Sequence, residues 1–191
     1  MEQNELKEQI LETATDLFRR KGLKFTMQDV ASEMHVAKKT IYTIYTSKEE
    51  LLMDLVETGF QRIQDVKRQV LESDLPLKEK ISTVLIAMPE NYRTLDFRRL
   101  TGMDEKYPEV SARIAEHLKS EWEPIIEILQ EGMQKGYIYP ISIPVLKQMV
   151  TSSIDSFMYS NELVTSGITY QEALNEMVTI IMNGVWNDKT E

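Results

Sequence analysis

Apolar residues recur every three to four positions along most of this 191-residue sequence, which is the spacing that lines one face of an α-helix. The first such face consists of Leu6, Ile10, Ala14, Leu17 and Phe18. A basic turn and Gly22 follow it, where cations at the negative end of the helix dipole and a C-terminal glycine belong. The pattern predicts an all-α protein of about nine helices.

Two pairs of residues near the N-terminus have the spacing of helix capping boxes, in which each side chain accepts a hydrogen bond from the other residue's backbone. Thr26 with Asp29 predicts a short second helix that ends near His35. Ser47 with Glu50 predicts the start of a long fourth helix, which continues as a single apolar stripe.

A third helix, over residues 37–45, is predicted between these two. Ala37 stands at the start of the third helix and offers no side-chain oxygen to cap it. Two short helices joined by a tight turn, with a small, polar or basic outer face on the second, suit a helix-turn-helix that enters the major groove.

Charge is unevenly distributed along the chain. The formal net charge is -9, yet residues 19–48 hold seven basic residues against two acidic ones. From residue 71 onward there are 11 basic residues against 19 acidic ones. Because basic and hydroxyl-bearing side chains suit phosphates, the sequence predicts two parts with different partners, the N-terminal one meeting nucleic acid.

The N-terminal stretch resembles the DNA-binding domain of the tetracycline-repressor (TetR) family of bacterial transcription regulators. The matching elements are Ala14, Leu17, Phe18, Gly22, Thr26, Asp29 to Ala31, Val36, Thr40 to Tyr42, Tyr45 and Ser47 to Glu49. The resemblance implies a helix-turn-helix domain over residues 1–48 and a helical ligand-binding and dimerisation domain over residues 49–191. It makes the fourth helix, about residues 48–72, the connector. At the turn before the third helix the family usually has glycine and this sequence has His35, so the resemblance implies a left-handed or near-left-handed backbone at His35.

The resemblance also implies which residues meet double-stranded operator DNA. Those at positions that hold phosphates are Thr26, Thr40, Tyr42 and Lys48. Those at positions able to reach base edges are Ala37, Lys38, Lys39 and Thr43. Taken alone, Lys38 and Lys39 would be an ordinary solvated pair, and it is the motif around them that favours DNA contact.

The rest of the chain predicts five further helices and few chemical signals. They are expected over residues 77–100 with a kink or break at Pro89, 103–118, 120–136, 146–158 and 169–185. Capping boxes formed by Ser120 with Glu123 and by Thr169 with Glu172 are expected to start the seventh and ninth helices.

The last two helices carry apolar stripes wider than one packing face needs. Similar proteins of the family pair these helices with their twofold mates, so the resemblance implies a homodimer. The predicted interface residues are Met149, Ile154, Met158, Leu174, Met177, Val178, Ile181, Met182 and Val185.

Methionines and aromatic residues on the fifth to eighth helices suit an adaptable cavity, although such residues are as often plain core. The predicted lining of a pocket for an unknown small-molecule effector is Met88, Tyr92, Phe97, Met103, Tyr107, Trp122, Ile126, Met133, Ser153 and Phe157. A regulator of this kind is expected to be a repressor that its effector releases from DNA. The alternatives are an activator of the same fold and a helix-turn-helix interaction module without ligand control.

Other classes of function lack support in the sequence. Cysteine is absent, which excludes disulfides and thiolate chemistry and is compatible with the cytoplasm, where we expect the protein. No stretch approaches the roughly 18 apolar residues of a membrane span, so no membrane partner is expected. No nucleotide-binding or hydrolase motif occurs, so we expect neither enzyme activity nor a cofactor. His117 and Glu121 are predicted to be a surface pair and no metal site.

Overall fold

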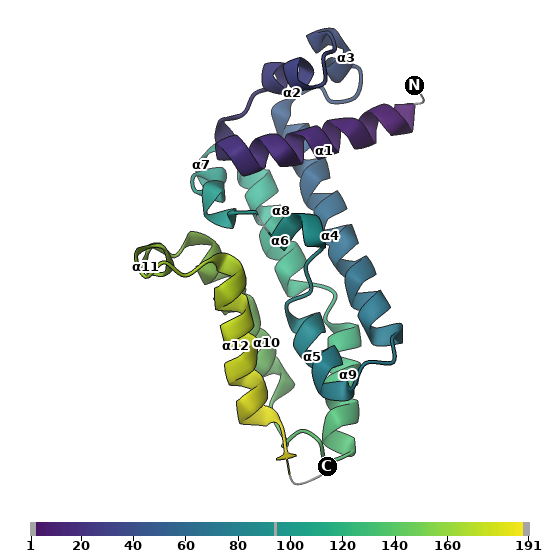
Figure 1. The fold of residues 1–191 in the computed structure, drawn as a ribbon, viewed down its shortest axis with the longest axis vertical. Helices are drawn as coiled ribbons and strands as arrows, with labels where there is room; N and C mark the ends of the chain where they lie inside the picture. The colour runs from purple at the N-terminus through teal and green to yellow at the C-terminus, as the bar shows by residue number, and fades with distance from the viewer. Residues whose placement is uncertain (1–2, 94, 189–191) are drawn as a thin grey trace. The chain divides into compact units, whose positions relative to one another are not determined.

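The computed structural model describes residues 3–93 and 95–188 of the chain (Figure 1). These residues form twelve α-helices and two 3-10 helices, and their one extended pairing is an isolated bridge between Ile138 and Trp186. The predicted all-α fold is confirmed. The described residues separate into two compact units, a first unit of residues 3–60 and 95–114 and a second unit of residues 61–93 and 115–188.

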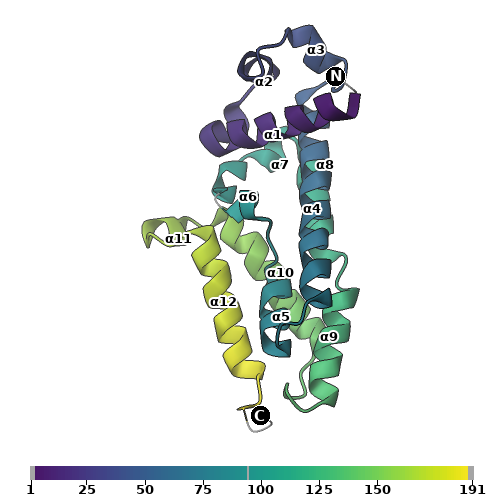
Figure 2. The same ribbon diagram turned by 45° about the vertical axis from the view of Figure 1, so that its right-hand side comes forward.

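The first unit contains the N-terminal helices. Its elements are α1 (Gln3–Lys21), η1 (Gly22–Lys24), α2 (Met27–Glu33), α3 (Lys38–Tyr42), the first half of α4 (Lys48–Glu72), η2 (Phe97–Leu100), α7 (Met103–Lys106) and the start of α8 (Pro108–Lys119). α2 packs against both α1 and α3, and the two short helices lie together beside α1 (Figure 2). Ile10, Val30 and Ile41 are fully buried in the core that joins these three helices.

The capping box predicted for α2 is present, whereas only half of the one predicted for α4 forms. At α2, the Asp29 amide donates to the Thr26 hydroxyl at 3.1 Å, and the Thr26 amide donates to the Asp29 carboxylate at 2.7 Å. At α4, the Glu50 amide donates to the Ser47 hydroxyl at 3.1 Å. The Glu50 carboxylate, however, accepts from the amide of Thr46 at 2.6 Å, one residue earlier than expected.

The predicted backbone of the turn is also confirmed. His35 has φ 55°, in the left-handed region, and its amide donates to the Ser32 carbonyl at 3.2 Å. Ala37 is the N-cap residue of α3 and makes no side-chain capping bond. The chain therefore turns between α2 and α3 without a glycine.

Residues 95–114 pack with the N-terminal helices, whereas the predicted domain boundary placed them with the rest of the chain. The Arg99 guanidinium donates to the Arg20 carbonyl at 2.7 Å, and a Cβ on Gly22 would lie 3.0 Å from the Arg99 Cβ. On the same side, Arg113 of α8 pairs with Glu57 of α4, at 3.1 Å for one of its nitrogens. These ion-pair and backbone contacts have no periodic signature in the sequence.

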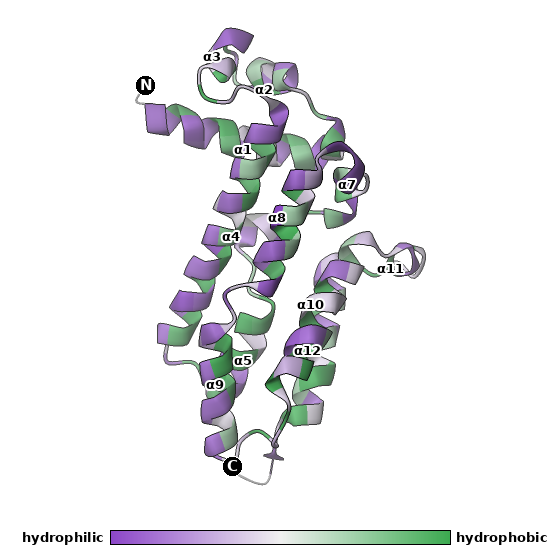
Figure 3. Cartoon of the chain, turned by 180° about the vertical axis from the view of Figure 1, so that it is seen from behind, coloured by the Kyte–Doolittle hydropathy of each residue, from purple (hydrophilic) through white to green (hydrophobic). Residues whose placement is uncertain are grey.

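The second unit holds the remaining helices together with the later parts of α4 and α8. Its own elements are α5 (Leu77–Leu85), α6 (Glu90–Arg93), α9 (Glu123–Gln134), α10 (Ile143–Tyr159), α11 (Asn161–Thr165) and α12 (Tyr170–Val185). α5 packs against α9 and α12, and α12 also packs against α10. Ile81, Leu129 and Leu174 are almost fully buried, and apolar and polar positions interleave along these helices (Figure 3).

The later helix predictions are correct in outline and wrong in detail. The predicted fifth helix breaks before Pro89, as expected, but the remainder of its range forms only the short helices α6 and η2. The predicted sixth helix divides at Pro108, because proline has no amide to continue α7. Ser120 does not cap α9, since Glu121 is left-handed with φ 56° and Trp122 becomes the N-cap residue. The box of Thr169 with Glu172 is confirmed, whereas α11 was not predicted.

Within the described ranges, the chain has neither a membrane span nor a metal centre. Of the helices in residues 3–93 and 95–188, none has both the length and the hydropathy of a bilayer-spanning segment. No three histidine, aspartate or glutamate side chains in these ranges are grouped closely enough to hold a metal ion.

Gly22→Ala should destabilise the protein, because the substitution combines an unfavourable backbone conformation with a steric contact. Gly22 has φ 58°, and its added Cβ would meet Arg99 at 3.0 Å. We expect the free energy of unfolding in urea to fall by about 2–3 kcal/mol. Gly102→Ala is the matched control, since φ is 81° there but no atom lies within 4 Å of the added Cβ. Equal losses in the two variants would contradict the Arg99 contact.

Candidate nucleic-acid interface

The short helix α3 has one buried and one exposed face. Ile41 is fully buried against the core, and Tyr45, one turn later, is only 3% exposed. On the opposite side, Lys38, Lys39 and Thr43 are exposed to solvent. Because Ile41 and Tyr45 fix the rotation of α3, its basic and hydroxyl-bearing face points away from the protein.

The exposed face of α3 offers both free and engaged groups. Lys39 makes no hydrogen bond or ion pair within the described residues, whereas the Lys38 ammonium lies 5.4 Å from the centre of the Tyr42 ring. Tyr42 is 40% exposed. The Thr43 hydroxyl donates to the Thr40 carbonyl at 2.7 Å, which leaves its oxygen lone pairs toward solvent. Lys39 is therefore the cation of this face with the greatest freedom to meet a base edge.

Thr26 was predicted to hold a phosphate, but its hydroxyl is committed within the protein. The hydroxyl donates to the Asp29 carboxylate at 2.8 Å while it accepts from the Asp29 amide. A phosphate would have to compete with an ionised carboxylate for the same proton. The structure therefore assigns Thr26 to the start of α2, and its phosphate role stays a prediction without support from its contacts.

Lys48 was also predicted to hold a phosphate, and its ammonium is likewise engaged inside the first unit. It donates to the Leu23 carbonyl at 2.5 Å and to the Phe25 carbonyl at 2.6 Å, and it lies 4.3 Å from the centre of the Phe25 ring. Burial lowers the pKa of Lys48, and the nearby charge of Lys106 lowers it further. Two of its three N–H groups thus join α4 to the segment before α2, which leaves one for a phosphate.

Ion pairs hold the helix-turn-helix against the end of α1. Lys21 pairs with Asp29 at 2.6 Å, and Arg20 pairs with Glu33 at 2.9 Å. Hydrogen bonds from Lys21 and then from Thr26 lower the pKa of Asp29 from 3.8 to about 2. Since these are the two acidic residues of residues 19–48, the charge left unpaired on this part of the chain is positive.

The ten predicted effector-pocket residues are divided between the two units. Phe97, Met103 and Tyr107 belong to the first unit and the other seven to the second. Met103, Tyr92 and Trp122 are at most 7% exposed and belong to the packed core. The role of these ten residues remains a prediction.

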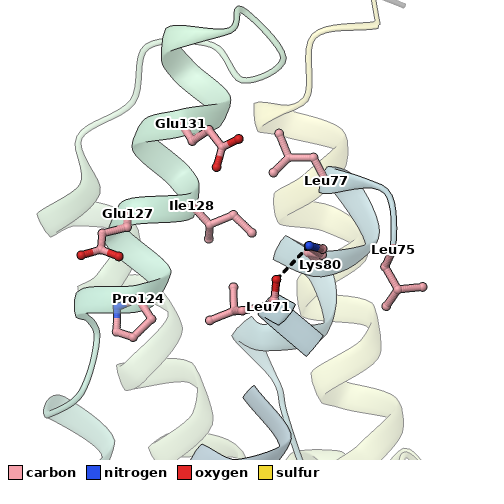
Figure 4. Close-up of a pocket in the computed structure, with 8 residues that line it drawn as sticks. All are labelled: Leu71, Leu75, Leu77, Lys80, Pro124, Glu127, Ile128 and Glu131. Carbon is pink, nitrogen blue, oxygen red and sulfur yellow. Dashed lines mark hydrogen bonds between the residues drawn. The ribbon is translucent and has the colours of Figure 1, made fainter. Parts of the chain in front are cut away.

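A pocket that the sequence did not reveal lies in the second unit, between the end of α4, α5 and α9 (Figure 4). Its volume is about 410 Å³. The residues that line it are Leu71, Leu75, Leu77, Lys80, Pro124, Glu127, Ile128 and Glu131. Several of them lie at the joint between α4 and α5, where no regular periodicity applies, so pattern analysis could not group them.

Most residues of the predicted dimer interface are packed inside the subunit, and the interface stays a prediction. Met158, Leu174, Met177, Val178, Ile181 and Met182 are at most 9% exposed. Among the nine, Met149 is the one that is largely exposed, at 56%. The exposed apolar surface of α10 and α12 consists instead of Val145, Met149, Tyr159 and Ile180.

Two short helices joined by a left-handed turn, packed on α1 and bearing a basic outer face, define a helix-turn-helix DNA-binding protein. Residues 10–55 match the family described as bacterial regulatory proteins, tetR family. Residues 10–55 therefore carry the DNA-binding domain of the TetR family, and the chain is a DNA-binding transcription regulator that is similar to members of that family along its length.

Similarity to known regulators extends over nearly the whole chain. The uncharacterised HTH-type transcriptional regulator YvaF of Bacillus subtilis (strain 168) is 26% identical over 181 residues, which cover 94% of this chain and 95% of that protein. The fatty acid degradation regulator FadR from Bacillus halodurans has a TM-score of 0.65 at 22% identity, covering 92% of this chain and 93% of that one. FadR from Bacillus subtilis, in complex with stearoyl-CoA, has a TM-score of 0.63 at 22% identity, covering 93% and 98%. At such identities, the solved structures establish the fold.

Lys39 and Lys48 should behave differently when each is replaced, because one is free and the other is engaged. An operator is first selected in vitro from random DNA. Lys39→Ala should then reduce the difference in binding free energy between this operator and altered operators by about 1–3 kcal/mol. It should leave the free energy of unfolding unchanged. Lys48→Met should lower the free energy of unfolding by about 1–3 kcal/mol, since two partly buried carbonyls lose their donor. Fluorescence anisotropy and urea denaturation measure the two quantities. The assignment is wrong if Lys48→Met unfolds like the wild type.

Proposed function

We propose that this protein is a homodimeric transcription repressor that leaves its operator when a small amphipathic molecule binds. The observation that carries the proposal is the exposed basic face of α3, held outward by the burial of Ile41 and Tyr45. On this face, Lys38, Lys39, Ala37 and Thr43 read base edges, while Tyr42 and Thr40 hold phosphates. The main role of Thr26 and Lys48 is to position α2 and α4.

DNA binding of this kind requires two copies of the chain. α3 has five residues, which span roughly 7–8 Å, whereas successive half-sites lie about 34 Å apart. The exposed apolar residues of α10 and α12 supply a surface for the pairing: Val145 and Met149 are each 56% exposed, and Ile180 is 63% exposed. Burying such side chains in a twofold contact removes apolar area from water.

Fatty acyl compounds are the first candidates for the effector. Two of the structures with the same fold are FadR proteins, and one of them holds stearoyl-CoA. This chain also has a pocket of about 410 Å³ in its second unit, within the range typical of small-molecule sites. A ligand that prefers the released conformation would weaken operator binding by about 5- to 150-fold, which corresponds to about 1–3 kcal/mol of coupling.

Genome-wide mapping of bound DNA is the experiment that tests this function. We expect a small set of palindromic sites, bound by purified protein in gel-shift assays and released by palmitoyl-CoA or another compound from a screen for thermal stabilisation. Deleting the gene should raise transcription at these sites. A fall in transcription would instead identify an activator, and the absence of any specific site would favour the interaction module.

Ile180→Glu should separate the dimer into monomers, because it places a charge on the exposed apolar face of α12. Light scattering at micromolar concentration measures the molecular mass. Operator affinity should fall when the dimer is lost. Asn175→Glu is the control, since Asn175 is also exposed on α12 but lies on another side of the helix. Ile181 is unsuitable for this test because it is packed inside the subunit. A variant that remains dimeric would rule out this surface.

A further inference from the structure

A lysine occupies the apolar face of α4 in the second unit. Ile63 lies four positions before Lys67, and Val70 and Leu71 lie three and four positions after it, so the four side chains share one side of the helix. All four residues are half-buried. Helical amphipathicity would place an apolar residue at this position, so the charge requires a separate explanation.

The charge of Lys67 is not neutralised within the described residues. Its ammonium forms no hydrogen bond there and no ion pair within 4 Å. Burial lowers the pKa of Lys67, and the charge of Glu121 acts in the opposite direction. Glu121 is itself exposed, so water solvates its carboxylate. A half-buried cation without a partner is costly, and an anion delivered from solution would offset that cost.

The pocket in Figure 4 begins one helical turn farther along α4. Leu71, four residues after Lys67, lines it, and so does Pro124, three residues after Glu121. Lys67 and Glu121 therefore lie one helical turn before the pocket. We call the surface between α4 and α9 that contains Lys67, Glu121 and the pocket the strip. Leu77 and Ile128 extend its apolar lining farther along.

The charged residues of the pocket give a ligand a direction. The Lys80 ammonium donates to the Leu71 carbonyl at 2.8 Å, so this cation is already engaged. Glu127 and Glu131 lie along α9 beyond Pro124. The Glu131 carboxylate pairs with Lys135 at 2.5 Å. Glu127 would repel an anionic group at this end of the pocket. Lys67 is the cation that remains for an acidic group.

We propose that the strip between α4 and α9 binds an amphipathic anion. Its apolar chain lies in the pocket against Leu71, Leu77 and Ile128, and its acidic oxygens pair with the Lys67 ammonium. The acidic group is a carboxylate or a phosphate, which share the negative oxygen that Lys67 recognises. The consequence for transcription rests on the proposed function, whereas the binding itself does not.

Titration calorimetry with hexadecanoate, palmitoyl-CoA and hexadecan-1-ol, each below its aggregation limit, tests this site. The wild type should bind at least one of the two anions ten or more times more tightly than the alcohol. Lys67→Met should weaken the binding of that anion at least tenfold and leave the binding of the alcohol unchanged. Lys67→Arg should bind the anion as the wild type does. Arg68→Met is the matched control, because it removes the same charge from the neighbouring, solvent-facing position, where the side chain is 62% exposed.

The two anions distinguish the source of the charge. If Lys67→Met lowers the affinity for hexadecanoate, the acidic group that Lys67 recognises is a carboxylate. If it lowers the affinity for palmitoyl-CoA alone, the group is a phosphate. The site is overturned if no probe binds the wild type, if Lys67→Met binds both anions as the wild type does, or if it weakens the alcohol equally. Such a result would mean that the lysine stem merely covers apolar surface while its ammonium reaches water.

Operator affinity, measured in the same samples, separates this inference from the proposed function. Lys67-dependent binding that leaves operator affinity unchanged would contradict effector control and preserve the site. Operator release by a palmitoyl compound that is equally strong in Lys67→Met would preserve effector control and overturn the site.

Discussion

The geometry of the DNA-binding unit depends on how the short segment between Leu23 and Asp29 is held. From one side, the Lys48 ammonium binds the Leu23 and Phe25 carbonyls, and so joins the start of α4 to this segment. From the other side, Thr26 and Asp29 close the capping box of α2, and Lys21 pairs with the Asp29 carboxylate at 2.6 Å. Because α2 starts at a fixed place, the left-handed turn and the buried face of α3 are fixed with it, and the basic face of α3 is turned outward.

The same segment connects DNA binding to parts of the chain that are distant in sequence. Lys48 lies 5.6 Å from the centre of the Tyr107 ring, and Arg99 binds the last turn of α1 through the Arg20 carbonyl. α4 is one continuous helix whose first half belongs to the first unit and whose second half carries Lys67. A ligand that changes how α4 is held at Lys67 therefore acts on the helix that also carries Lys48. The effector control that we propose therefore requires no catalytic group.

Sequence patterns predicted features that depend on local spacing, and they failed where the outcome depends on tertiary contacts. The box of Thr26 with Asp29 was predictable because the two residues are near neighbours, and the left-handed His35 was predictable because the resemblance places a glycine at that turn. Ser120 could not be judged in this way, since the left-handed Glu121 and the burial of Trp122 move the start of α9. Periodicity likewise identified the apolar residues of α12 but could not show that Ile181 serves its own subunit while Ile180 remains exposed. The resemblance predicted that Lys48 holds a phosphate, but it could not show that the Lys48 ammonium donates to the Leu23 and Phe25 carbonyls.

If operator and effector bind to two conformations of one protein, as we propose, each must weaken the binding of the other by the same factor. The most direct test measures operator affinity with and without saturating effector, and effector affinity with and without saturating operator, at one salt concentration. We expect two equal factors of about 5- to 150-fold. An effector that binds with the same affinity to free and operator-bound protein would contradict it.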